Sequence, residues 1–136
     1  MKQLYEIAEN ENINVIERNM PNSFNGFFYR EGKFNLICLK RRLRKVYKRI
    51  TFAHELGHYF TSSGNVLFQD RESFNTCSKN EYLARKWAAE YLIHKDQLTM
   101  YLNHLDGDYL NEYELADIFN VTADFVRFRI NILRNN

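Results

Sequence analysis

The sequence predicts an α+β fold, with a small antiparallel sheet near the N-terminus packed against a mostly helical core. Two observations support this class. Up to residue 40, short runs of aromatic and β-branched residues alternate with turn residues, as in strands. Beyond residue 43, apolar residues recur every three or four positions, as in helices that bury one face. The 136 residues are 45% hydrophobic, which is enough for a single domain over residues 1–136 with its own core.

The N-terminal elements follow from the spacing of apolar and turn residues. Two apolar runs around three turn residues indicate a β-hairpin. In chain order we expect a helix over Lys2–Asn10, a strand over Ile13–Glu17, a turn at Pro21-Asn22-Ser23, and a hairpin of Gly26–Arg30 and Phe34–Lys40 around Glu31-Gly32-Lys33.

The remaining chain is predicted to be helical, apart from a polar loop over Ser62–Ser78. The expected helices run from Leu43 to about Thr61 and over Glu81–Ile93, Lys95–His104, Asn111–Asn120 and Thr122–Leu133. The last two resemble a helix-turn-helix, whose second helix would enter the major groove of DNA. That helix offers only Arg127 and Arg129 as cations, so we interpret the pair as part of the core and consider a nucleic-acid partner the less favoured reading.

The bulk composition excludes several classes of protein. The net charge is +2, which does not by itself imply a polyanionic partner. No apolar run is long enough to span a membrane, and the N-terminus lacks the apolar core of an export signal, so we expect a cytoplasmic protein. Cys38 and Cys77 lie far apart in the chain, which indicates free thiols rather than a disulfide.

One short string indicates chemistry: His54-Glu55-Leu56-Gly57-His58. Two histidines four residues apart in a helix project from the same face and can share one metal ion. Glu55 lies beside that ion without being forced to bind it. A zinc-bound water next to a carboxylate is the centre of a hydrolytic metallopeptidase site, in which Glu55 would be the catalytic base.

Catalytic zinc sites use three protein ligands, so a third is needed. One class takes a third histidine six residues after the second, but that position here is Gly64. The other, gluzincin-like class takes a glutamate from a later helix, which leaves Glu81 and Glu90. We favour Glu81, because Ala84 and Ala88 continue its stripe of small residues and would let the two helices approach closely. Cys77 is a less favoured alternative.

The chain resembles the ImmA/IrrE family of zinc metallo-endopeptidases of bacteria, phages and mobile elements. The resemblance rests on four stretches: the hairpin with Gly26 and Asn35–Leu39, the string Ile50–Phe60, the helix Glu81–Ile93, and Glu114–Thr122 continuing to Arg129. It implies a zincin-like core, zinc on His54 and His58 with Glu81 as the matching third ligand, and Glu55 as acid/base. It also implies a repressor-type regulatory protein as substrate. Three positions depart from the family pattern: Trp87, where phenylalanine is frequent, His94, where proline is frequent, and Arg85, where some related peptidases place an acid.

Two further features leave alternatives open. A second donor to the developing oxyanion is usual, and the candidates are His94 and Tyr82, followed by Tyr91 and His104. The segment Lys40–Arg49 holds seven cations in ten residues. It is either a solvated face or an electropositive rim that attracts an acidic substrate or nucleic acid. The alternative to a peptidase is a non-proteolytic, zinc-containing regulator that binds DNA or protein, or a toxin-like component.

Overall fold

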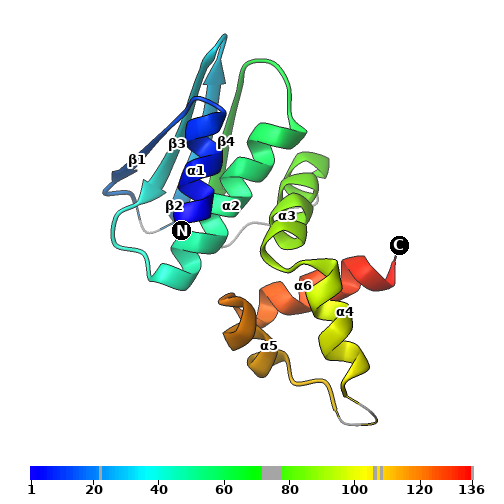
Figure 1. Ribbon diagram of the computed structural model, residues 1–136. Coiled ribbons are helices and arrows are strands. Elements are labelled where there is room, and N and C mark those ends of the chain that lie inside the picture. The colour runs from blue at the N-terminus through cyan, green and yellow to red at the C-terminus, as the bar shows by residue number, and fades with distance from the viewer. Residues whose placement is uncertain (22, 72–77, 106, 108, 136) are drawn as a thin grey trace.

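The α+β class is confirmed by the structure, a computed structural model that describes residues 1–21, 23–71, 78–105, 107 and 109–135. Strands lie at one end of the molecule and a group of helices at the other (Figure 1). The elements are α1 (Lys2–Asn10), β1 (Ile13–Arg18), β2 (Phe24–Glu31), β3 (Phe34–Lys40), α2 (Lys45–Thr61), β4 (Val66–Arg71), α3 (Lys79–Leu92), α4 (Lys95–Asn103), α5 (Glu112–Phe119) and α6 (Ala123–Arg134). None of these helices is both long and apolar enough to cross a membrane.

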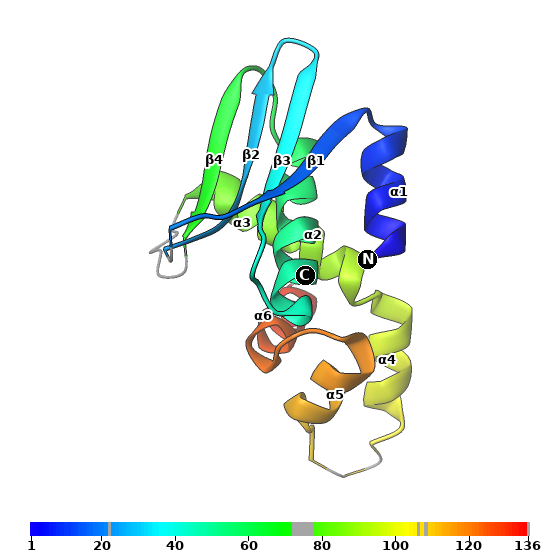
Figure 2. The same cartoon turned by 90° about the vertical axis from the view of Figure 1, so that its left-hand side faces the viewer.

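The sheet is mixed rather than wholly antiparallel. Its strand order is β1-β3-β2-β4, visible edge to edge in Figure 2. The hairpin of β2 and β3 forms as predicted, with Gly32 at φ +59° in the turn. Strand β1, however, pairs with the outer side of β3 and runs parallel to it. Alternating apolar residues report which face is buried and carry no information on strand direction, so the sequence could not reveal this pairing.

Strand β4 corrects the prediction of a loop over Ser62–Ser78. It pairs antiparallel with β2, with Phe68 opposite Phe28 and Leu67 opposite Tyr29. Its apolar part is short and surrounded by polar residues, so the strand depends on a partner some forty residues earlier in the chain rather than on local propensity. Part of the predicted loop, including Cys77, lies outside the described residues, as does Asn22 of the predicted turn.

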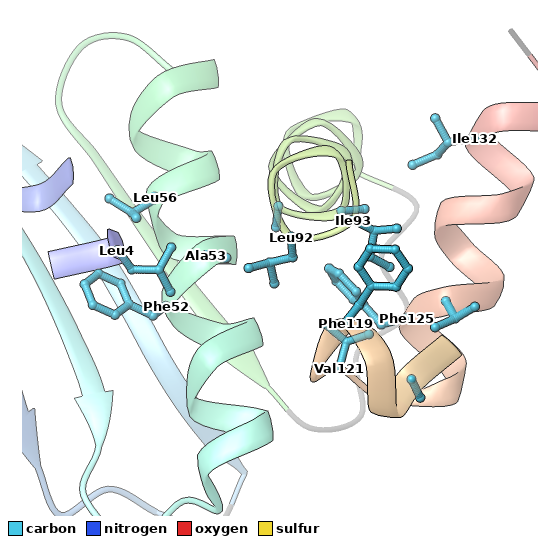
Figure 3. Close-up of a cluster of buried hydrophobic side chains, with 14 of the residues drawn as sticks. Leu4, Phe52, Ala53, Leu56, Leu92, Ile93, Phe119, Val121, Phe125 and Ile132 are labelled. Carbon is cyan, nitrogen blue, oxygen red and sulfur yellow. The ribbon is translucent and has the colours of Figure 1, made fainter. Parts of the chain in front are cut away.

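Helix α2 lies in the middle of the molecule. All residues from Thr51 to His58 are buried, as expected for a helix covered on every side. It contacts β2 and β3 on one side and α3 on the other. Figure 3 shows Phe52 and Leu56 turned towards Leu4 of α1, whereas Ala53 faces Leu92 of α3. The buried centre of the chain is therefore also the helix that carries the His54–His58 string.

The C-terminal helices complete the core and are tied to the rest of the chain by two arginines. Arg49 of α2 donates to the backbone oxygens of Phe119 and Asn120, at the end of α5. Arg129 of α6 is buried and donates from Nε to the Ile93 oxygen over 2.8 Å. Buried apolar residues of α5 and α6 gather around Leu92 and Ile93, as in Figure 3. The helix pair thus belongs to the same core as α3.

Cys38 lies in β3, is buried and forms no disulfide with any described residue. Burial raises the pKa of its thiol and favours the protonated form.

Candidate metal centre and adjoining pocket

His54 and His58 lie on one face of α2, one helical turn apart, as their spacing predicts. Their rings are 4.8 Å apart between centroids. His58 is fully buried and His54 is 6% exposed. The ring of His58 stacks on Phe68 of β4, with centroids 4.1 Å apart and planes 10° apart. The strand that sequence reasoning missed therefore orients one of the two histidines.

Glu81 lies in the first turn of α3 and reaches both histidines. Its Oε2 atom is 2.9 Å from His54 Nε2, and its Oε1 atom is 3.1 Å from His58 Nε2. The turn begins at Ser78, whose hydroxyl accepts a 3.2 Å hydrogen bond from the Glu81 backbone N–H. Ser followed three residues later by Glu is a known helix-start signature. This signal in the sequence predicts where α3 begins, and so fixes the position of Glu81 in its first turn.

These three side chains could hold a metal ion, because their potential ligand atoms all lie within 4.8 Å of one another. Ligands about 2.0–2.1 Å from a tetrahedral zinc ion are about 3.3 Å apart. The observed separations of 2.9 and 3.1 Å between carboxylate and imidazole atoms are close to that value. Two imidazoles and one carboxylate also match the donor set of catalytic rather than structural zinc sites. The residues present therefore fit a divalent metal.

The packing of α2 on α3 brings the three side chains together. Ala84 and Ala88, the small residues that follow Glu81 on α3, are fully buried. The sequence predicted that this stripe would allow close approach, and α2 and α3 are indeed extensively packed. Glu55 lies on α2 next to His54 and is fully buried. A buried carboxylate needs compensating charge or hydrogen bonds, and a neighbouring cation supplies the strongest compensation.

A pocket of about 350 Å³ adjoins this centre and shares His54 with it. The pocket lies between α2 and α6, with Arg85 of α3 at its wall. Aromatic and aliphatic side chains form much of its lining, namely Tyr47, Ile50, Phe125 and Phe128. The guanidinium of Arg85 lies over the Phe128 ring, 5.4 Å from its centroid. Pockets of this size and polarity are typical of ligand sites.

Arg85 belongs to the site in a way that sequence reasoning did not anticipate. In the sequence it stands out only as a departure from the family pattern. It follows Glu81 by four residues, which places it on the same face of α3 one turn later. The i, i+4 spacing from Glu81 was the available signal.

The other candidate residues are more distant from the triad. Tyr82 is half-exposed, and its ring lies 6.0 Å from that of Phe128, at the edge of the pocket. The structure does not bring His94 to the metal centre. His94 is exposed and precedes α4, and the rise of α3 from Glu81 to Leu92 alone is about 16 Å. The ring of His94 instead lies 6.3 Å from that of Tyr91.

Glu90, the alternative third ligand, is exposed on α3. Nine residues after Glu81, it points to the opposite side of the helix. Its charge acts on Arg129, where it raises the pKa that burial lowers. Cys77, the other alternative, lies outside the described residues. Of the proposed third ligands, Glu81 alone is thus seen to reach the histidines in the described part of the chain.

Two histidines and a glutamate that could hold a metal ion are consistent with a metallopeptidase, and comparison with known proteins supports this class. The chain belongs to the Peptidase_M78 family, described as the IrrE N-terminal-like domain, whose model matches residues 8–131. This match confirms the family inferred from the four sequence stretches. The chain is also similar to "Uncharacterized immunity region protein 2" of Bacillus phage phi105. The two are 28% identical over 115 residues, which cover 84% of this chain and 68% of the phage protein. No solved structure matches the chain significantly.

Proposed function

We propose that the protein is a zinc-dependent endopeptidase, formed as one domain over residues 1–136, that hydrolyses a peptide bond in a regulatory protein. In this proposal His54, His58 and Glu81 bind the zinc ion, and Glu55 is the catalytic acid/base. The observation that carries the proposal is the approach of both imidazole Nε2 atoms to one carboxylate, at 2.9 and 3.1 Å, in a member of a metallopeptidase family.

The mechanism assigns one task to each group. When bound, zinc supplies a Lewis acid that lowers the pKa of a water molecule and polarises the scissile carbonyl. Glu55 accepts the proton of the attacking water and passes it to the nitrogen of the leaving amine. Arg85 lines the pocket beside His54, so it is a better-placed partner for the developing oxyanion than His94. Tyr82, at the pocket edge, remains a candidate for the same task.

The phage relative guides the choice of substrate. The name of that relative assigns it to an immunity region of the phage. A repressor-type regulator encoded beside the present chain is accordingly the substrate that we propose. Its cleavage would release the genes that it represses.

The test combines metal analysis with a cleavage assay. The purified protein, loaded with zinc, is incubated with the neighbouring regulator, and fragments are identified by mass spectrometry. We expect about one zinc per chain and a single major cleavage that Glu55→Gln abolishes while zinc is retained. Cleavage that persists in Glu55→Gln would contradict the assigned role of Glu55. A zinc-loaded protein that binds the regulator and leaves it intact would favour the non-proteolytic alternative.

A further inference from the structure

The pocket beside the metal centre extends along a single face of α2. Tyr47, Ile50, Thr51 and His54 all line it, and their i, i+3, i+4 and i+7 spacing places them on one stripe of the helix. Phe125 and Phe128 of α6 form the facing wall. Tyr47 and His54 are separated by about 10 Å along the helix axis. The pocket therefore leads from the metal centre towards the N-terminal end of α2.

At that end lie exposed cations, which we name the basic cluster: Arg41, Arg42, Arg44 and Lys45. Arg44 connects the cluster to the pocket, because its guanidinium lies over the ring of Tyr47, 5.2 Å from the centroid. The next two cations along α2 are engaged within the fold. Lys48 pairs with Glu17 at 2.5 Å, and Arg49 donates to the end of α5. The exposed cations of this segment thus lie next to the end of the pocket that Tyr47 lines.

The acidic groups near the pocket do not cancel this charge. Asp124 lines the pocket and shares Arg127 with Glu112, so these three side chains leave one negative charge, against the four positive charges of the basic cluster. Arg85 adds a further cation to the wall. An apolar cavity with a cationic approach favours a ligand that combines a bulky apolar group with negative charge.

We infer that the pocket and the basic cluster form one extended binding site for the substrate protein. A segment of that protein would place a large apolar side chain in the pocket and acidic side chains on the basic cluster. This inference rests on the proposed function and adds a substrate class to it. The spacing follows from the helix: Arg44 lies about 15 Å from His54 along the axis, and an extended peptide covers about 3.3 Å per residue. The acidic residues therefore fall about three to five positions from the apolar residue, on one side of it.

A peptide fits this site better than a nucleic acid. The cluster adjoins a largely apolar pocket, which a phosphate backbone would not fill. The helix pair α5–α6 does not extend the positive surface, because Arg129 is buried and Arg127 is paired with two acids. A duplex would also need cations spread over several phosphates along its length.

The test measures binding to zinc-loaded Glu55→Gln protein, so that no peptide is consumed. Short fluorescent peptides carry one Phe and a pair of Glu residues at increasing distance on either side. We expect the tightest binding at a spacing of about three to five residues on one side only, and about tenfold weaker binding when Gln replaces Glu. The preference should decrease with added salt.

Charge reversal in the basic cluster identifies the residues responsible. The double variant Arg44→Glu/Lys45→Glu should lose the preference for acidic peptides and instead prefer peptides in which Lys replaces Glu. The double variant Arg44→Gln/Lys45→Gln should lose the preference for acidic peptides without gaining one for Lys peptides. The matched control is Lys33→Glu, an exposed cation in the turn between β2 and β3, which should change nothing. Thermal unfolding checks that each variant is folded.

Three results would overturn the inference. The first is peptide affinity that does not depend on the position of Glu, and the second is an equal loss of affinity in the Lys33→Glu control. The third is binding of duplex DNA to the basic cluster together with peptide binding that is unchanged by charge reversal. The failure of the proposed function has a different signature. If the best peptide binds with the expected spacing but wild-type protein does not cleave it, the binding site stands and the peptidase assignment falls. If wild-type protein cleaves peptides whether or not they carry acidic residues, the peptidase assignment stands and the inferred binding site falls.

Discussion

Gly57 of α2 lies directly against the backbone of Ala84 on α3. A Cβ atom at Gly57 would come within 2.3 Å of the Ala84 carbonyl oxygen, which no real packing tolerates. The glycine inside the His54–His58 string is therefore required by the neighbouring helix. Because Ala84 follows Glu81 by less than one turn, this contact sets the distance between Glu81 and the two histidines.

Gly57→Ala should destabilise the protein and weaken metal binding together. In an unconstrained helix the same change stabilises by about 1 kcal/mol, because alanine is the better helix former. Here the clash with backbone should reverse the sign and cost about 1–3 kcal/mol. Urea unfolding of the metal-free variant measures the first effect, and zinc titration measures the second. A stabilised variant with unchanged zinc affinity would show that α2 and α3 are not packed this closely.

Glu81→Gln should lower zinc affinity by about 100-fold or more, since it removes a charged ligand and keeps the shape of the side chain. Glu90→Gln is the matched control, because Glu90 belongs to the same helix, is exposed and points to the opposite side. It should bind zinc as the unmodified protein does. Competition with a chromophoric chelator gives both affinities. If Glu81→Gln still binds zinc normally, the same competition assay on Cys77→Ser tests whether Cys77 is the third ligand.

The local patterns in the sequence were sufficient for the elements that depend on neighbouring residues. Helix α1 has the predicted bounds, and α2 begins only two residues later than expected. The proximity of the three side chains could also be anticipated, because a helix fixes the direction of His54 and His58 and small residues mark the face of α3 that carries Glu81. Each of these inferences uses residues within one or two helical turns.

Features that depend on distant parts of the chain could not be anticipated. Strand β4 exists through its pairing with β2. The pocket combines Arg85 with Phe128, whose positions are set by the packing of α3 on α6. His94 illustrates the same limit: it is a plausible donor by residue type, but the length of α3 separates it from His54 and Glu81. Spacing along the chain predicts which residues share a face, and not which faces meet.

Phe68→Leu tests whether β4 orients a metal ligand. The stack of Phe68 on His58 is close and nearly parallel, and aromatic pairs of this kind contribute about 0.5–1.5 kcal/mol beyond their buried area. We expect zinc affinity to fall by about 3- to 10-fold because the His58 ring gains freedom. The adjacent residue provides the control, since Leu67 is 54% exposed and faces the other side of the strand. An equal loss in Leu67→Ala would mean that the strand as a whole, rather than the stack, supports the site.

Arg129 and Arg127 lie on the same helix but differ in burial and in the number of ion pairs that they form. Replacing each in turn shows which of these two properties contributes more to the stability of the fold. Arg127 forms ion pairs with two acids but is about half exposed. Arg129 is 4% exposed and donates to the Ile93 carbonyl, where α3 ends and α4 begins. Arg129→Met should reduce the free energy of unfolding by about 1.5–3 kcal/mol, because it removes a charge-assisted hydrogen bond and leaves a buried carbonyl without this donor. Arg127→Met should cause a clearly smaller loss, since exposed ion pairs are screened by solvent. Urea unfolding of the two variants, compared at one ionic strength, decides the order. If Arg127→Met proves the more damaging, the surface ion pairs rather than the buried arginine attach α6 to the core.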